Sequence, residues 1–190
     1  MGIPLVTRAE YKSYAGLVSP NEDTKIDSLI PKVSDFVKTL CRRTFVDYVN
    51  DAKVEYHEGG ATIIVPEEYP VLSISSLEYS TDYGNTYTTL VEYTDYALSK
   101  FSHNIVSTWI DGFPIAINGY KLTYTAGFEV LPEDLKLAVF DLITYYLKND
   151  MAVHSSKAPG TNTVQIEYVT TTNLPSHIKR VLDQYAANYS

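Results

Sequence analysis

Several patterns are scarce or missing in this sequence of 190 residues, and each absence excludes a class of protein. A single cysteine, Cys41, rules out a disulfide within the chain. It lies among apolar residues at helical spacing, so we expect a buried structural thiol, which favours a reducing compartment. No apolar run reaches the roughly 18 residues that a membrane-spanning helix needs. The first residues lack the basic and apolar regions of a signal peptide, so the sequence predicts neither a membrane span nor secretion.

The short motifs of catalysis and metal binding are also missing. The sequence contains no H-E-x-x-H, C-x-x-C, phosphate-binding loop, G-x-G-x-x-G or G-x-S-x-G pattern. Each of the four histidines, His57, His103, His154 and His177, lacks a second histidine at metal-binding spacing. We therefore predict no catalytic residue, no metal site and no cofactor. A hydrolase that uses Asp111 with His103 is the least favoured hypothesis.

Positive charge is scarce in the middle of the chain. The net charge is −8, and residues 51–128 hold three lysines against ten carboxylates, whereas the flanks hold twelve basic and thirteen acidic residues. A dedicated nucleic-acid binder would carry a basic patch, so this balance argues against one. We interpret the acidic middle as a solvated face.

Two segments in the first quarter of the chain have the apolar spacing of helices. The first begins at Thr7, which with Glu10 predicts a capping box, and it ends at Gly16. The second begins near residues 21–23 and keeps its apolar spacing for four turns. Pro31 stands inside it and predicts a kink or a break, because proline lacks the N–H of the helical hydrogen bond.

Two more helices are predicted near the end of the chain, each begun by a proline. They start at Pro132 and Pro175, the position of a helix where proline is tolerated best. The first of them is apolar on one face through Leu135, Ala138, Val139, Leu142, Ile143, Tyr146 and Leu147, and on others through Leu137, Phe140 and Tyr145. A helix that is apolar most of the way round is central to the fold or also packs against another chain.

Between these helices the apolar period changes from that of a helix to that of a strand. Residues 52–125 contain six or seven short alternating segments separated by turn formers such as Gly59-Gly60, which predicts an antiparallel sandwich or barrel. Within 150–174, residues 154–163 are expected to form a polar loop. Residues 164–172 are β-prone and are expected to pair within the chain or with a neighbour.

The predicted fold class is therefore α+β, a small helical bundle formed by both ends of the chain with an antiparallel β sandwich or barrel-like insert. The predicted parts are a helical core over 1–50 and 129–190, with its long loop at 150–174, and an acidic β-rich insert over 51–128. The apolar faces at the two ends must meet in order to be buried.

The order and spacing of four segments resemble one known family. These segments are the capped "LVTRAEYKSYAGL", the helical "DTKIDSLIPKVSDFVKTLCRRTF", the strand and helix "YKLTYTAGFEVLPEDLKLAVFDLITYYLKND", and the final "NLPSHIKRVLDQY". Together they are similar to the head–tail connector, or adaptor, proteins of tailed bacteriophages. The resemblance covers both flanks, about 110 residues, and the insert is larger than the smallest members of that family need.

The resemblance implies a structural protein of the virion neck, assembled in the cytoplasm of the bacterial host. It implies a homo-oligomeric ring, usually of twelve copies, beneath the portal protein. The ring receives a stopper or tail protein, and genomic DNA passes through it without specific binding; no membrane is involved. The implied portal-docking candidates are Ile178, Leu182, Tyr185 and Tyr189. The inter-subunit candidates are Phe140, Tyr145, Tyr146, Val164, Ile166 and Tyr168.

The seventeen tyrosines support an alternative, a neck- or tail-associated β module that binds a glycan or a partner protein. Aromatic rings on a β surface stack on sugars, and tyrosine suits protein interfaces. Core packing is the favoured interpretation for the tyrosines at inward-alternating positions, Tyr56, Tyr79, Tyr87, Tyr120 and Tyr124.

Overall fold

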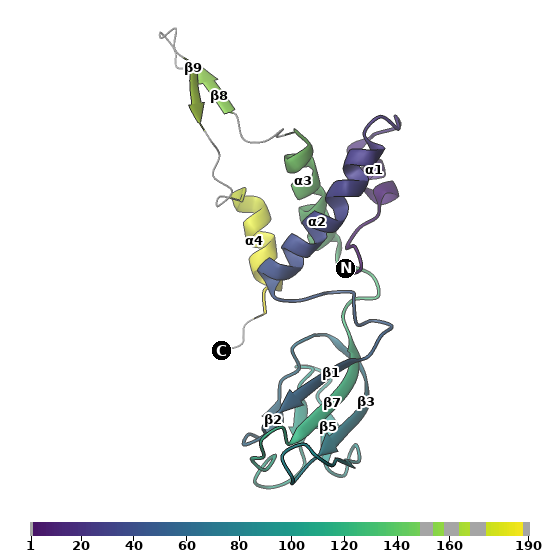
Figure 1. The fold of residues 1–190 in the computed structure, drawn as a ribbon, viewed down its shortest axis with the longest axis vertical. Coiled ribbons are helices and arrows are strands. Elements are labelled where there is room, and N and C mark those ends of the chain that lie inside the picture. The colour runs from purple at the N-terminus through teal and green to yellow at the C-terminus, as the bar shows by residue number, and fades with distance from the viewer. Residues whose placement is uncertain (1, 149–153, 158–163, 168–173, 188–190) are drawn as a thin grey trace. The chain divides into compact units, whose positions relative to one another are not determined.

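The computed structural model describes residues 2–148, 154–157, 164–167 and 174–187. These residues contain four helices and strands in antiparallel sheets, which confirms the predicted α+β class (Figure 1). They form two compact units. The helical unit consists of the described residues of Met1–Arg43 and Leu131–Ser190, and the β unit consists of Thr44–Val130. None of the described helices has the length and hydropathy to cross a membrane.

Helix α1, Arg8–Ala15, begins and ends as predicted. The Glu10 backbone N–H donates to the Thr7 hydroxyl at 3.2 Å, and the Thr7 N–H donates to the Glu10 carboxylate at 2.8 Å. This reciprocal pair satisfies two N–H groups that lack a partner inside the helix. At the other end Gly16 takes a left-handed conformation, with φ of 65°.

Helix α2, Asp23–Cys41, is one continuous helix that includes Pro31, so the alternative of a break at this residue is wrong. Proline removes one hydrogen bond from the helix. Buried residues on both sides of it, among them Ile30 and Val33, hold the two halves in the same core. Cys41 is fully buried at the end of the helix, where burial raises the pKa of its thiol to about 11. It is a structural thiol, as predicted.

Helices α3, Glu133–Lys148, and α4, Ser176–Tyr185, complete the bundle. Both α3 and α4 pack on α2, and they also pack on each other (Figure 1). The predicted inner face of α3 is buried from Leu135 to Ile143. The chain after α4 returns to α2, where the Ala187 N–H donates to the Cys41 carbonyl at 2.9 Å.

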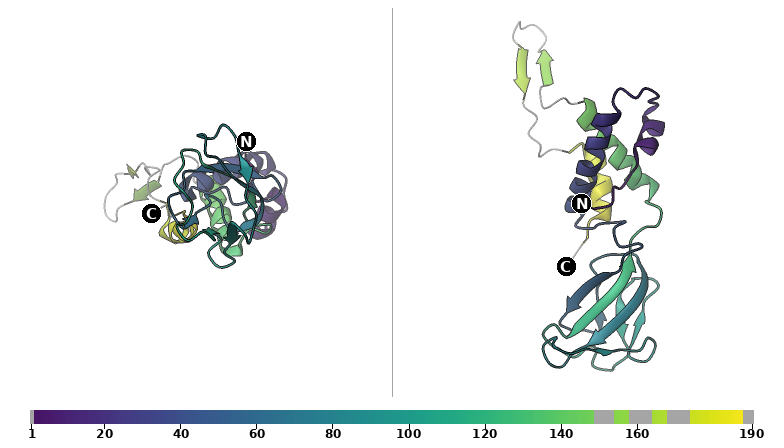
Figure 2. Two further views of the ribbon diagram at one scale, coloured as in Figure 1. Left: turned by 90° about the horizontal axis from the view of Figure 1, so that it is seen from below. Right: turned by 45° about the vertical axis from the view of Figure 1, so that its right-hand side comes forward.

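The β unit contains two antiparallel sheets (Figure 2). One has the strand order β1 (Lys53–His57), β7 (Tyr120–Ala126), β3 (Val71–Tyr79) and β4 (Thr88–Thr89); the other has β2 (Ile63–Ile64), β6 (Ile105–Ser107) and β5 (Tyr96–Leu98). They share a core that includes Leu77, Ile105 and Phe113, and the described strands do not close into a barrel. Every second residue of β7 from Tyr120 is buried, which is the alternation that the sequence predicted.

Strand β1 differs from the prediction. Tyr56, predicted to point inward, is 57% exposed, whereas its neighbour Glu55 is 6% exposed. Because side chains alternate along a strand, the inward position belongs to the glutamate. The partners of this carboxylate, described below, make its burial possible.

The segment between α3 and α4 contains a further pair of strands. Strand β8, His154–Lys157, pairs antiparallel with β9, Val164–Glu167, with His154 opposite Glu167. The prediction of a polar loop over residues 154–163 is therefore wrong at 154–157. Strand pairing uses backbone groups, so a polar segment forms a strand once a partner such as β9 lies beside it. The β-prone residues 164–167 pair within the chain.

Backbone hydrogen bonds join the first and last residues of the β unit. The N–H of Phe128 donates to the Phe45 carbonyl at 2.7 Å, and the N–H of Ala126 donates to the Tyr48 carbonyl at 2.9 Å. Between them Gly127 has φ of 113°, and a Cβ atom there would lie 2.3 Å from the Phe45 oxygen. Only glycine permits both this conformation and this close approach.

Leu142 on α3 tests the helical core. Its side chain is fully buried, so Leu142→Asp places an unpaired charge in an apolar interior. We expect the loss of stability to be on the order of 4–5 kcal/mol, enough to unfold the helical unit. Circular dichroism during urea titration measures it. The matched control is Leu137→Asp on the same helix, where the side chain is 46% exposed and folding should be retained. A native-like Leu142→Asp protein contradicts the core assignment.

Candidate functional site: interaction surfaces

The described residues contain no cluster of three or more histidine, cysteine or acidic side chains able to hold a metal ion. The residues of the hydrolase hypothesis, His103 and Asp111, lie on loops that leave opposite ends of the short strand β6. Asp111 is exposed. The surfaces of the two units are therefore where we look for function.

Phe140, an inter-subunit candidate, is used inside its own subunit. It is 7% exposed, and its ring stacks on Tyr14 of α1 with centroids 5.0 Å apart and on Tyr11 at 6.1 Å. Tyr14 also donates its hydroxyl to Asp141 at 2.8 Å. These contacts fix α1 against α3. Contact between copies through Phe140 is therefore limited to the edge that stays exposed.

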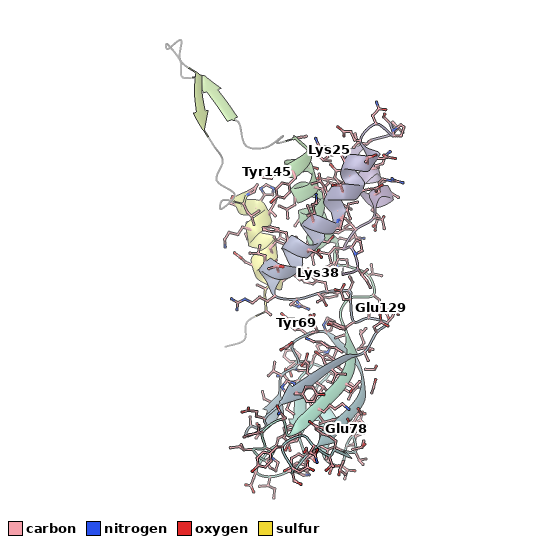
Figure 3. All side chains as sticks on the ribbon, viewed as in Figure 1. Lys25, Lys38, Tyr69, Glu78, Glu129 and Tyr145 are labelled. Atoms are coloured by element: carbon pink, nitrogen blue, oxygen red, sulfur yellow. The ribbon has the colours of Figure 1, made fainter. Side chains whose placement is uncertain are left out.

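The other inter-subunit candidates stay predictions. Tyr145, labelled on α3 in Figure 3, and Tyr146 are half-buried, and their ring centroids lie 5.6 Å apart in an edge-to-face arrangement. Val164 and Ile166 belong to β9, and their side chains are outside the described part of the structure. Tyr168 lies outside the described residues.

The portal-docking candidates lie mainly on the inner face of α4. Ile178 is 2% exposed and Leu182 is 1% exposed, so docking through them would require α4 to leave the bundle. Tyr185 is half-buried and donates its hydroxyl to Asp134 at 2.6 Å. Burial and this hydrogen bond raise the pKa of Tyr185 to about 12. Tyr189 lies outside the described residues, and the docking assignment stays a prediction.

Two exposed helix faces were not predicted. On α2, Phe36 and Leu40 are 36% and 42% exposed. Lys25 (Figure 3) and Lys32 belong to the same side of the helix by their spacing of seven residues from each other and of four residues from Lys32 to Phe36. On α3, Leu137 lies between Glu133 and Asp141 at helical spacing. The helical spacing of the apolar residues predicted the helix α2 but did not separate Phe36 and Leu40 from the buried residues. The angle around the helix axis could have separated them, because Phe36 and Leu40 lie to one side of the stripe that Ile26, Ile30, Val33 and Val37 form.

A groove of about 430 Å³ also opens in the helical unit. It lies between α1, the connection from α1 to α2, and the end of α3, and its lining includes Tyr11, Tyr14, Leu17, Thr144 and Leu147. The Tyr11 and Thr144 hydroxyls lie 3.1 Å apart. The lining combines apolar and hydroxyl side chains with two charged residues, Glu22 and Lys148.

Glu55 is a buried acid of the β unit with a strongly perturbed pKa. Burial alone would raise its pKa, but hydrogen bonds from His57, Tyr124 and Lys53 outweigh this and lower the pKa to about 2. Lys53 Nζ lies 2.9 Å from Oε1, and His57 Nε2 lies 3.2 Å from Oε2. The Tyr124 hydroxyl donates to Oε1 and accepts from the backbone N–H of Glu68 at 3.0 Å.

This network is structural rather than catalytic. The carboxylate of Glu55 is enclosed, with a side chain 5% exposed, and also accepts from the backbone N–H of Glu67. Burial, followed by the hydrogen bond to Glu55, raises the pKa of the Tyr124 hydroxyl, so the tyrosine stays a donor. The network ties β1 and β7 to the segment before β3.

Glu55 therefore makes the stability of the β unit sensitive to acid. A carboxyl with a folded pKa of about 2 and an ordinary value of 4.5 stabilises the fold above about pH 4.5, and this contribution is lost as the pH falls toward 2. We expect Glu55→Gln to cost on the order of 2–3 kcal/mol at pH 7 and to reduce the pH dependence in that window. Urea titrations at several pH values measure both, with the exposed Glu58→Gln as control. Parallel pH curves for wild type and Glu55→Gln would contradict this role.

The fold and surfaces define a class, an α+β protein with an inserted β unit and exposed apolar helix faces. The sequence profile described as "HCP: Head completion protein" matches residues 4–187. The chain belongs to the head completion protein family, which assigns it a structural role as a head–tail connector of a virion. No curated protein matches the sequence.

Solved structures with the same fold come from gene transfer agent (GTA) particles. A chain from "Neck of empty GTA particle computed with C6 symmetry" is 16% identical, with a TM-score of 0.63 over 100% of this chain and 91% of that one. A chain from "Virion of native gene transfer agent (GTA) particle" is 15% identical, with a TM-score of 0.62 and the same coverage. One from "Neck of native GTA particle computed with C12 symmetry" is 16% identical, with a TM-score of 0.57 over 96% and 88% of the two chains. At this identity the likeness shows the fold.

Proposed function

We propose that the protein forms a non-catalytic ring in the virion neck, between the portal and the tail or stopper protein, with DNA passing through its centre. Family membership carries this proposal. The neck structures that share the fold were computed with six-fold and twelve-fold symmetry, which supports a ring of this order. Assembly would take place in the cytoplasm of the host before the tail is joined.

The exposed helix faces support contact between copies. The α2 face is basic and apolar, with Lys25, Lys32, Phe36 and Leu40. The α3 face is acidic and apolar around Leu137, although Lys136 offsets part of the Glu133 charge at 3.0 Å. Two different, complementary faces on one subunit make a head-to-tail contact, which closes into a ring when the rotation allows. The apolar residues would supply affinity, and the charges would supply register.

The acidic balance of the chain supports free passage of DNA. The β unit holds three lysines against twelve carboxylates, while the rest of the chain is near neutral. DNA binding without sequence preference depends on lysine and arginine contacts to phosphates. A protein of net charge −8 offers few such contacts, so DNA would not adhere to the ring.

For portal docking we propose the outer surface of α4 together with Tyr185. Ile178 and Leu182 then serve to hold α4 in the bundle, since both are buried. Tyr185 combines a partly exposed ring with a hydroxyl fixed by Asp134, which presents the ring in one orientation. A rigid aromatic anchor of this kind loses little entropy on binding.

A charge exchange tests the ring contact. We expect Lys32→Glu and Glu133→Lys, each alone, to lower incorporation into DNA-filled heads several-fold, because like charges then face each other across the contact. The double variant restores opposite charges and should restore incorporation. Quantitative immunoblots of purified heads measure this, with the exposed Lys100→Glu of the β unit as control. Full incorporation of both single variants would exclude this pair of faces.

The alternative function, glycan binding by the β unit, would have to use exposed tyrosines. Tyr56, Tyr83 and Tyr93 are 57%, 75% and 76% exposed, in contrast to the buried Tyr120 and Tyr124. We expect no saturable signal when the full chain is applied to a glycan array, because these three rings form no described groove. A signal that disappears in Tyr83→Ala or Tyr93→Ala would instead establish the glycan-binding function.

A further inference from the structure

The connection from β6 to β7, residues 108–119, displays isoleucines to solvent. Ile110 is 100% exposed, Ile115 is 81% exposed and Ile117 is 56% exposed. We call these residues the isoleucine loop. Removing such a side chain from water is favourable, because apolar surface is then buried. Three such side chains on one loop are apolar area that the subunit itself does not bury, and exposed apolar area of this kind is typical of interaction sites.

The loop is anchored by an aromatic side chain beneath it. Phe113 is 1% exposed, and its ring packs edge-to-face on Tyr120 at 5.1 Å and on Trp109 at 6.2 Å. The Tyr120 ring stacks in turn on Tyr79 of β3 at 5.0 Å. The core of the β unit therefore fixes the middle of the loop, and the isoleucines lie on either side of this anchor in sequence.

Backbone hydrogen bonds hold the loop against the turn that follows β1. The Phe113 N–H donates to the backbone carbonyl of Ala61 at 2.9 Å, and the Gly60 N–H donates to that of Phe113 at 2.7 Å. The Ala116 N–H donates to the backbone carbonyl of Glu58 at 2.8 Å. Gly112 has φ of 77°, and a Cβ atom there would lie 2.7 Å from the Ala61 oxygen. The backbone of the loop is thus already in one conformation, so binding through it costs little ordering entropy.

The charge around the loop restricts what can bind it. Glu58 and Asp111 are exposed beside the isoleucines, and residues 101–120 contain no lysine or arginine. DNA and anionic lipid carry the same sign of charge. The β unit of a second copy does so too, with its three lysines against twelve carboxylates, and the basic α2 face of that copy is already used in the proposed ring contact. Each of these partners would be repelled, whereas a surface with lysine or arginine around an apolar recess would be attracted.

We propose that the isoleucine loop is the site through which this connector binds the next protein of the neck on the tail side. That protein is a different chain from the connector, and it presents an apolar recess bordered by basic residues. The inference rests on the proposed function. It assigns a neck protein other than the portal because we propose a different surface, α4, for the portal contact.

The experiment uses a particle-producing strain whose own copy of the gene is deleted and supplied from a plasmid. We expect the double variant Ile110→Ser, Ile115→Ser to enter DNA-filled heads at the wild-type level but to lower the number of tailed particles about tenfold or more. Electron microscopy counts the particles, and immunoblots of heads measure incorporation. Ile110→Ser alone, at a side chain exposed to 100%, serves if the double variant folds poorly.

The matched control is Phe101→Ser. Phe101 is 97% exposed, but it lies on the connection from β5 to β6. This connection joins β6 at the end opposite to the isoleucine loop. Its loss should leave tailed particles at the wild-type number. Asp111→Lys should lower tail attachment in the same direction as the isoleucine variants, because it places a positive charge toward the basic border of the recess.

Two results would overturn the assignment. Normal tail attachment by a folded isoleucine variant shows that the loop is not used. A folded variant that is missing from heads shows that the loop serves the portal or a neighbouring copy instead. The uncomplemented deletion tests the proposed function separately, since tailed particles without any copy of the protein would exclude a connector role altogether.

Discussion

The closing of the β unit on itself is the constraint on which the rest of the structure depends. The helical unit is assembled from two stretches of chain separated by the 87 residues of Thr44–Val130. Its halves can meet only if the first and last residues of that insert lie together. The hydrogen bonds from Phe128 to Phe45 and from Ala126 to Tyr48 achieve this, and Gly127 permits their close approach. The segment from Tyr124 to Leu135 therefore connects strand β7 to helix α3, and its backbone hydrogen bonds also close the β unit.

The two units expose different kinds of surface. The helical unit keeps its best apolar residues inside, including Ile178, Leu182 and most of Phe140, and leaves narrow faces of mixed charge outside. The β unit is strongly acidic, and its most exposed apolar side chains lie on loops held by backbone hydrogen bonds. The carboxylate of Glu55 is stable in the interior because the ammonium group of Lys53, the imidazole of His57 and the hydroxyl of Tyr124 surround it.

The sequence predicted the features that depend on neighbours along the chain. The capping box of α1 depends on two residues three positions apart, the inward alternation of β7 on a period of two residues, and the buried face of α3 on a period of 3.6 residues. Each of these predictions was confirmed. Family membership was predicted from the order of four such segments and was confirmed by the family profile. The predictions failed where other parts of the chain determine the surroundings of a residue. Tyr56 is exposed because Glu55 takes the inner position, and the polar residues 154–157 form a strand because β9 pairs with them.

By itself the sequence determined the elements of this protein, its α+β class and the family to which it belongs, because periodicity and capping act over a few residues. Only the tertiary structure decided which apolar residues remain outside. Phe36, Leu40 and the three isoleucines of 108–119 have the same chemistry as their buried neighbours. Burial depends on what the rest of the chain places against a side chain, and that is a property of long-range packing rather than of local pattern.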